Sequence, residues 1–214
     1  MKGVETMESF DQIIKTISLS MGAAWASGIN LYATVFVLGI LGATDNLVLP
    51  QNLEILSDPV VLWASGFMYC VEFFADKTPG LDTGWDAIHT FIRIPAGVMI
   101  AAGAVGDVNP SLALAAGILG GGLATGSHLT KSGSRLLINT SPEPFSNWIA
   151  SVLEDVAVIG GILAALHYPI VFLILLVGFF CLVVWLLPKI WRGIKMLFAK
   201  IKSFFNKDAP RQIS

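Results

Sequence analysis

Six long apolar segments follow one another along the chain, and they constrain its fold more than any other feature of the sequence. They lie at roughly Ile17–Gly42, Val60–Ala75, Phe91–Gly106, Ser111–Thr130, Phe145–Leu166 and Pro169–Leu187. With 55% apolar and only 13% charged residues, the chain differs from a soluble domain in composition. Because a helix needs about 20 apolar residues to cross a bilayer, the sequence predicts an all-α, polytopic membrane protein with about six transmembrane helices.

The basic residues predict an orientation. The connections TDNLVLPQNLEILSDP, DVNPS and HYP contain no Lys or Arg, so all 13 basic residues of the chain lie elsewhere. The positive-inside rule then predicts a protein of the cell (inner) membrane with both termini in the cytoplasm. We expect a cytoplasmic N-terminal segment at 1–16, a transmembrane domain at 17–187 and a basic cytoplasmic tail at 188–214.

The tail has a helical pattern of its own. In KIWRGIKMLFAKIKSFFNK, apolar residues recur at the spacing of one helix face, and basic residues lie toward the other. This pattern predicts an amphipathic helix at the inner membrane surface that is attracted to anionic lipid.

The two halves of the transmembrane domain share a weak sequence match. ASGINLYA in the first segment and ATGSHLTK in the fourth have Ala, Gly and Leu at matching places and pair Asn30 with His128. Three helices in each half would relate 17–106 to 111–187 as an inverted repeat. Short matches of small residues are common in membrane helices, so a chance match explains the pattern equally well.

Several acidic residues fall at membrane depth. At about 1.5 Å per residue from the start of each segment, Glu72 lies roughly 18 Å into the membrane and Glu154 and Asp155 roughly 14 Å. Charged carboxylates there cannot face lipid, so they must line a polar cavity, pair with cations or carry protons. A buried ion pair that only locks helices together, such as Glu154 with Arg93 or Lys77, is the structural alternative.

These residues predict a substrate or ion site. Its candidate members are Glu72, Asp76, Glu154, Asp155, Asn30 and His128, with Lys77 and Arg93 as charge-balancing residues. Carboxylate oxygens suit hard cations, and intramembrane acids also suit proton coupling. The favoured function is therefore a secondary transporter or channel for a cation or a small polar solute.

A second polar group lies between the second and third segments. Asp82, Asp86 and His89 share one helix face between chain breaks at Pro79–Gly80 and Pro95. This spacing predicts a short charged helix that is separate from the third membrane helix, and we favour a solvated, cytoplasmic position for both acids.

Those three residues also carry the competing function. They could serve as acid/base groups or metal ligands of a membrane-embedded enzyme that acts on lipid head groups. The chain has no Gly-x-Ser-x-Gly or His-Glu-x-x-His motif, which weighs against an enzyme. A membrane assembly subunit without transport activity is a third alternative. Nothing in the sequence predicts a cofactor, a nucleotide or nucleic acid as a partner.

Four stretches carry a resemblance to known families. SGINLYA, ADKTPGLD, WDAIHTFIRIPAG and the glycine-rich fourth segment resemble a family of small bacterial membrane proteins classified as a domain of unknown function (DUF4126), over residues 17–185. This resemblance implies the membrane class and no particular activity.

EFFADKT also resembles the Glu-x-Gly-Asp-Lys-Thr motif of six-helix cation/proton exchangers, which carry it in two inverted repeats. Here one extra residue separates the acids, Ala75 replaces the glycine, and the second copy is reduced to Glu154–Asp155. This second resemblance implies a cation site at these acids.

Overall fold

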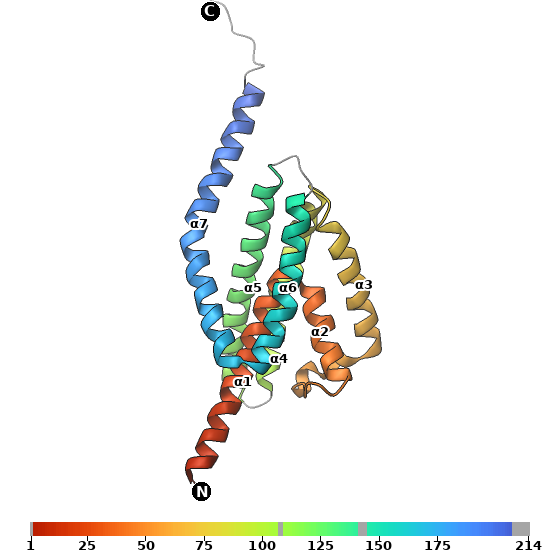
Figure 1. Ribbon diagram of the computed structural model, residues 1–214, viewed down its shortest axis with the longest axis vertical. Helices are drawn as coiled ribbons and strands as arrows, with labels where there is room; N and C mark the ends of the chain where they lie inside the picture. Colours follow the sequence, from red (N-terminus) through yellow and green to blue (C-terminus); the bar gives the residue numbers. More distant parts are fainter. Residues whose placement is uncertain (1, 107–108, 141–144, 207–214) are drawn as a thin grey trace, which may run out of the picture.

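The computed structural model describes residues 2–106, 109–140 and 145–206, and the regular structure of these residues is helical throughout. The prediction of an all-α fold is confirmed. The elements are α1 (Lys2–Ile29), α2 (Leu31–Ala43), the short 3-10 helix η1 (Gln51–Ser57), α3 (Pro59–Ala75), α4 (Leu81–Val105), α5 (Pro110–Ile138), α6 (Phe145–His167) and α7 (Pro169–Asn206), drawn in Figure 1.

Length and hydropathy support a membrane protein. Within the described residues, four helices are long and apolar enough to cross a bilayer, namely α4, α5, α6 and the Pro169–Met196 part of α7, whereas α2 and α3 are shorter apolar helices. Large apolar side chains cover the outside of the bundle; Phe91, for example, is 83% exposed. Such a surface is expected where lipid rather than water surrounds a protein.

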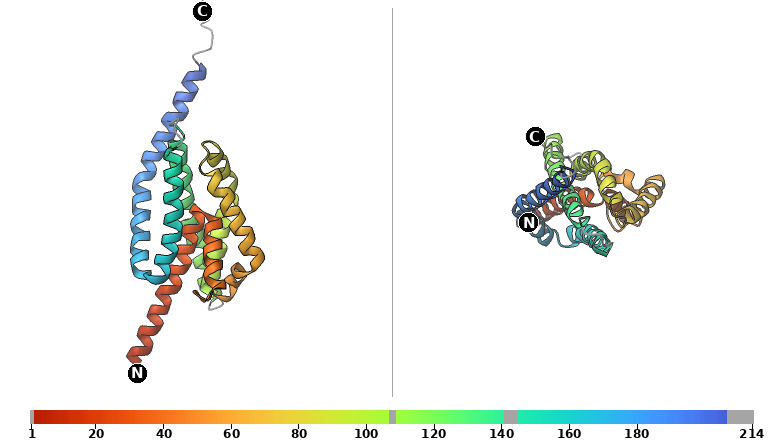
Figure 2. Two further views of the ribbon diagram at one scale, coloured as in Figure 1. Left: turned by 45° about the vertical axis from the view of Figure 1, so that its right-hand side comes forward. Right: turned by 90° about the horizontal axis from the view of Figure 1, so that it is seen from above.

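The first predicted span, Ile17–Gly42, is not a single helix. Asn30 adopts an extended backbone (φ −144°, ψ 98°) between α1 and α2, and the chain reverses direction there (Figure 2). Leu41 near the end of α2 consequently lines the same pocket as Lys15 and Leu19 of α1. The two helices form a hairpin with its tip inside the bundle, an arrangement that membrane proteins tolerate where the broken backbone is buried in protein.

The hairpin changes the topology. From α3 to α7, successive helices run along the bundle in opposite directions. The described ends of the chain, in α1 and α7, therefore project from opposite ends of the bundle (Figures 1 and 2). The prediction that both termini lie on one side assumed an even number of crossings. The hairpin adds a reversal that hydropathy alone cannot reveal, and the side of the membrane on which each end lies stays a prediction.

The predicted inverted repeat also fails to appear. α1 and α5 pack in parallel, because Ala24 faces Gly120 and Gly28 faces Ala124. A Cβ atom on Gly28 would lie 2.2 Å from the carbonyl oxygen of Ala124, so this close approach requires glycine. An inverted repeat would place the two matched segments antiparallel. The two matched segments also differ in conformation, since Asn30 interrupts the helix between α1 and α2 whereas His128 lies within the continuous helix α5.

α4 is longer than predicted. It runs without interruption from Leu81 to Val105 with Pro95 inside it, so the predicted separation into a short charged helix and a membrane helix beginning at Phe91 is wrong. Proline within a helix removes one hydrogen bond, but neighbouring helices allow this in membrane bundles.

α7 passes through a proline in the same way. It continues through Pro188 to Asn206, so the predicted tail helix is the extension of the last span up to that residue. Its attraction to anionic lipid stays a prediction, and residues 207–214 of the predicted tail lie outside the described residues.

Candidate functional site

Buried charges fill the interior of the bundle at the end where α3 meets α4 and α5 meets α6. On α4, Asp82, Asp86 and Arg93 are at most 1% exposed, whereas Ile88 and Phe91 between them face outward. The prediction of a solvated helix for the two acids is therefore wrong. α4 turns its polar face inward because its partner helices bring opposite charges, and its apolar face covers the outside.

Arg93 links two acids in this interior. Its Nη2 donates to Glu72 of α3, and its Nη1 donates to Asp86 Oδ1 at 2.8 Å. All three side chains are almost completely buried. The predicted charge-balancing role of Arg93 corresponds to these two ion pairs, which hold the C-terminal end of α3 against α4.

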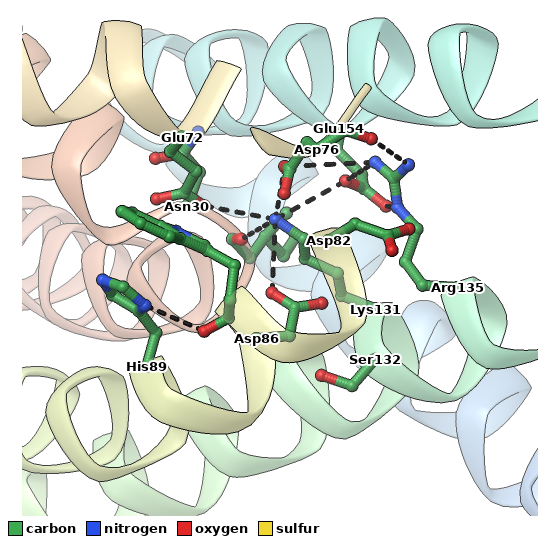
Figure 3. A network of polar contacts seen from close by, with 12 residues as sticks. Asn30, Glu72, Asp76, Asp82, Asp86, His89, Lys131, Ser132, Arg135 and Glu154 are labelled. Atoms are coloured by element: carbon green, nitrogen blue, oxygen red, sulfur yellow. Dashed lines mark hydrogen bonds and ion pairs between the residues drawn. The ribbon is translucent and has the colours of Figure 1, made fainter. Parts of the chain in front are cut away.

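Lys131 of α5 lies at the centre of the group (Figure 3). Its Nζ atom donates to Asp76 Oδ2 at 2.7 Å, to Glu72 Oε1 at 3.2 Å and to the Ile29 carbonyl oxygen at 3.1 Å. Carboxylate oxygens of Asp86 and Glu154 both lie 3.7 Å from the same atom. Lys131 directly follows the fourth predicted span, Ser111–Thr130, and is not among the site residues predicted from the sequence.

Arg135 is the second basic residue that sequence reasoning missed. Its Nε and Nη2 donate to the two carboxylate oxygens of Glu154 at 3.2 and 2.6 Å, and its Nη1 donates to the carbonyl oxygens of Asp76 and Asn147. The spacing of four residues between Lys131 and Arg135, with His128 three residues earlier, puts all three on one helix face. That spacing is the signal that could have found them.

The helix break brings backbone atoms to the same place. Asn30 Oδ1 accepts the backbone N–H of Ala33, and Asn30 Nδ2 donates to Asp155 Oδ1 at 3.1 Å. In a continuous helix the Ala33 N–H would bond the carbonyl of Ile29. Because Asn30 takes that donor, the Ile29 carbonyl is left to accept a hydrogen bond from Lys131.

His128 extends the group toward α4. Arginine can only donate, so the 3.2 Å contact from Arg93 Nη1 makes His128 Nδ1 an acceptor. A neutral imidazole must then carry its hydrogen on Nε2, which lies 2.6 Å from Thr90 Oγ1. Beside two buried cations, a neutral His128 avoids a third positive charge.

The three residues proposed for the competing enzyme site have separate partners. Asp82 accepts from Asn139 Nδ2 and the backbone N–H of Gly80, whereas Asp86 pairs with Arg93. His89 contacts the hydroxyl of Tyr32 at 3.0 Å and the carbonyl oxygen of Trp85 at 2.8 Å. These partners do not draw the three side chains into one shared site.

Lys77 lies at the rim. Its Nζ atom lies 3.0 Å from the centre of the Phe73 ring and donates to Ser151 Oγ at 3.2 Å. Burial lowers the pKa of the Lys77 ammonium, and the nearby Asp155 and Asp76 carboxylates partly offset this effect. No ion pair joins Lys77 to a described acid, so Lys131 and Arg135 do the charge balancing predicted for it.

The ion-paired group carries an excess of acid. Four carboxylates, from Glu72, Asp76, Asp86 and Glu154, face three cations, from Arg93, Lys131 and Arg135. One oxygen each of Glu72, Asp76 and Asp86 is buried without a hydrogen-bond partner among the described residues. No three His, Cys, Asp or Glu side chains in the described part of the chain are arranged to hold a metal ion.

Fold and site together define an α-helical protein with apolar helices long enough to cross a membrane and a charged interior beside a broken helix. The chain belongs to the family described as a domain of unknown function (DUF4126), which matches residues 17–189. Neither a curated protein nor a solved structure matches the chain.

Proposed function

We propose that this protein is a secondary transporter or channel for a cation or a small polar solute, and that the buried charge cluster binds what it moves. The main support is the contact between the hairpin tip at Asn30 and the charge cluster. Lys131 of the cluster donates a hydrogen bond to the Ile29 carbonyl at this tip, and Asn30 donates one to Asp155. Broken helices supply such sites in transporters because their free carbonyls and helix ends can bind ions.

The cost of the cluster supports a function beyond packing. Replacing a buried ion pair by apolar residues of similar volume is often neutral or stabilising, so helix packing alone does not require one. Here seven ionisable side chains share one interior, while Leu153 and Val156 beside Glu154 are exposed on the outside. Ionisable residues enclosed in this way by apolar helices are functional by default.

Glu154 is the most exposed member of the cluster. Its side chain is 17% exposed, whereas those of its partners Lys131 and Arg135 are at most 1% exposed. Glu154 also contacts both Arg135 and Lys131, at 2.6 and 3.7 Å, so it is the best residue with which to test the proposal.

Charge distribution supports an orientation. The end of the bundle with the charge cluster carries Lys77 and the basic extension of α7, and the opposite connections contain no Lys or Arg. The positive-inside rule favours the cytoplasm for that end. The N-terminal part of α1 then lies outside, with the hairpin entering the membrane from there.

The test is transport in reconstituted vesicles with a panel of cations and small polar solutes. We expect Glu154→Gln to abolish transport, whereas the protein should still insert and fold because glutamine keeps an acceptor oxygen for Arg135 at this partly exposed position. Glu54→Gln is the matched control, because Glu54 is exposed in η1 at the other end of the bundle. Full transport by the Glu154→Gln variant, or none by the wild-type protein with any member of the panel, would contradict the proposal.

A further inference from the structure

We propose that Asp155 of α6 is a proton-binding site, and that the proton is the coupling ion of the transport proposed above. The inference rests on the proposed function and deepens it. Asp155 lies beside the charge cluster without being one of its ion-paired members, and a proton needs no cavity to hold it. Proton binding is measured without transport, so the two proposals can fail separately.

Asp155 is buried without a cationic partner. The residue is 8% exposed, and none of the ion pairs among the described residues includes its carboxylate. Asn30 Nδ2 donates to Oδ1 at 3.1 Å, whereas Oδ2 is buried with no hydrogen-bond partner in the described part of the chain. An ionised carboxylate with one donor and no paired cation is costly among apolar helices, and a bound proton removes that cost.

Asp82 of α4 is a useful comparison, because it is also fully buried and outside the described ion pairs. Its Oδ1 accepts from the backbone N–H groups of Gly80 and Thr83, and Asn139 Nδ2 donates to both of its oxygens at 2.8 and 3.0 Å. Such donors favour the ionised form of a carboxylate. Asp155 has no comparable set of donors, so these two buried acids differ in how well the protein supports their charge.

The charged groups around Asp155 do not replace a direct partner. Asp76, Lys77 and Lys131 act on it electrostatically, and the Tyr69 hydroxyl of α3 also interacts with it. Lys131 donates to Asp76 at 2.7 Å and so is already engaged. Four carboxylates of the cluster face three cations, and an ionised Asp155 would add to this excess of negative charge. A bound proton avoids that addition.

Asp155 also connects the rim of the bundle to the helix break. Lys77 Nζ at the rim donates to Ser151 Oγ at 3.2 Å, about one helical turn before Asp155 on α6. At the break, Asn30 contacts both Asp155 Oδ1 and the backbone N–H of Ala33. A hydrogen bond to a charged acceptor is stronger than one to a neutral acceptor. Binding and release of a proton therefore change the strength of the contact at the hairpin tip.

Infrared difference spectroscopy of the purified full-length protein in detergent tests the proton site. Raising the pH from about 5 to about 9 should remove the carbonyl-stretch band of a protonated carboxylic acid, because buried carboxyl groups release protons within this range. We expect complete loss of this band in Asp155→Asn. The variant should fold, because asparagine keeps an acceptor oxygen for Asn30 and resembles the protonated acid.

Two variants are matched controls for the other acids. Asp82→Asn and Glu154→Gln each remove a different carboxylate, and both should keep the band. A band that persists in Asp155→Asn, one that disappears in Glu154→Gln, or none in the wild-type protein overturns the inference. If Asp155→Asn does not fold, Asp155→Glu takes its place. This variant should shift the frequency of the band, and an unshifted band overturns the assignment to Asp155.

The coupling is tested in the vesicles used for transport. A pH gradient across the membrane should change the uptake rate of the wild-type protein several-fold, and Asp155→Asn should lose this response. Wild-type transport that is indifferent to the gradient would overturn the proton as coupling ion and leave the proposed function intact. If no member of the panel is transported, the proposed function and the coupling fail together, whereas the infrared result still decides whether Asp155 binds a proton.

Discussion

The Nζ atom of Lys131 lies 3.1 Å from the carbonyl oxygen of Ile29, and this contact joins the helix break between α1 and α2 to the buried charge cluster. Each part depends on the other. The free carbonyl is tolerable because an ammonium group satisfies it, and the ammonium is tolerable because the carbonyl and carboxylates surround it.

The first prediction concerns the Asn30–Asp155 hydrogen bond at the hairpin tip. Asn30→Asp keeps the acceptor for Ala33 but sets two carboxylates against each other, at a place where the native donor and acceptor lie 3.1 Å apart. We expect a loss of about 1–3 kcal/mol in the free energy of unfolding, the usual cost of a spoiled buried polar contact. The exchange Asn30→Asp/Asp155→Asn restores a donor and an acceptor and should recover most of it. Unfolding measurements that find the double variant no more stable than Asn30→Asp would count against this reading.

The second prediction concerns the buried pair of Arg93 and Glu72. Arg93→Met leaves the Glu72 and Asp86 carboxylates without their partner, and breaking a buried pair on one side costs about 3–5 kcal/mol. Arg93→Met/Glu72→Gln removes both charges and should be markedly more stable than the single variant. A double-mutant cycle on unfolding free energies measures the coupling.

The surface pair of Lys15 and Asp11 is the control for that cycle. Both side chains are 59% exposed, so Lys15→Met should change stability by about 0–1 kcal/mol. If Arg93→Met costs no more than this, the buried pair does not hold α3 against α4.

The third prediction concerns the close approach of α1 and α5. Gly28→Ala places a Cβ atom 2.1 Å from Ser127 Oγ and 2.2 Å from the Ala124 carbonyl oxygen, which forces the two helices apart. We expect a loss of about 1–3 kcal/mol from overpacking. Gly122→Ala on α5 meets no atom within 4 Å and should have little effect on stability. Equal stability of the two variants, measured by thermal unfolding, would mean that α1 does not pack on α5 as described.

The fourth prediction concerns topology. In a Cys70→Ser/Cys181→Ser background, an impermeant thiol reagent should label Met7→Cys from one side of the membrane and Ala199→Cys from the other. The physical reason is that the hairpin at Asn30 leaves an odd number of crossings between these two positions. Labelling of intact and inverted membrane vesicles measures the sides. Labelling of both positions from the same side would favour an unbroken first span.

The sequence predicted several residues of the charge cluster from their distance along each apolar segment. Counting residues from the start of each apolar segment puts Glu72 and Glu154 below the membrane surface, and the structure finds both in the buried cluster. The solvated position predicted for Asp82 and Asp86 is wrong, because both are buried. Their spacing on one helix face is the same whether that face contacts water or buried cations. Lys131 and Arg135 are absent from the predicted site for a related reason: basic residues that follow an apolar run have the same local pattern in a connection as in a continuing helix such as α5.

By itself, the sequence predicted the helical class, the apolar helices that suit a membrane and the burial of Glu72 and Glu154. These properties follow from hydropathy and from the rise of a helix, which depend on residues close together in the chain. Tertiary structure decided the hairpin at Asn30, the opposite ends for α1 and α7, and the pairing of each acid with its base. These depend on contacts between distant residues: an amide that caps one helix and bonds Asp155, 125 positions away, and a lysine that takes up a carbonyl 102 positions away. No local pattern contains such contacts, so only the packed bundle reveals them.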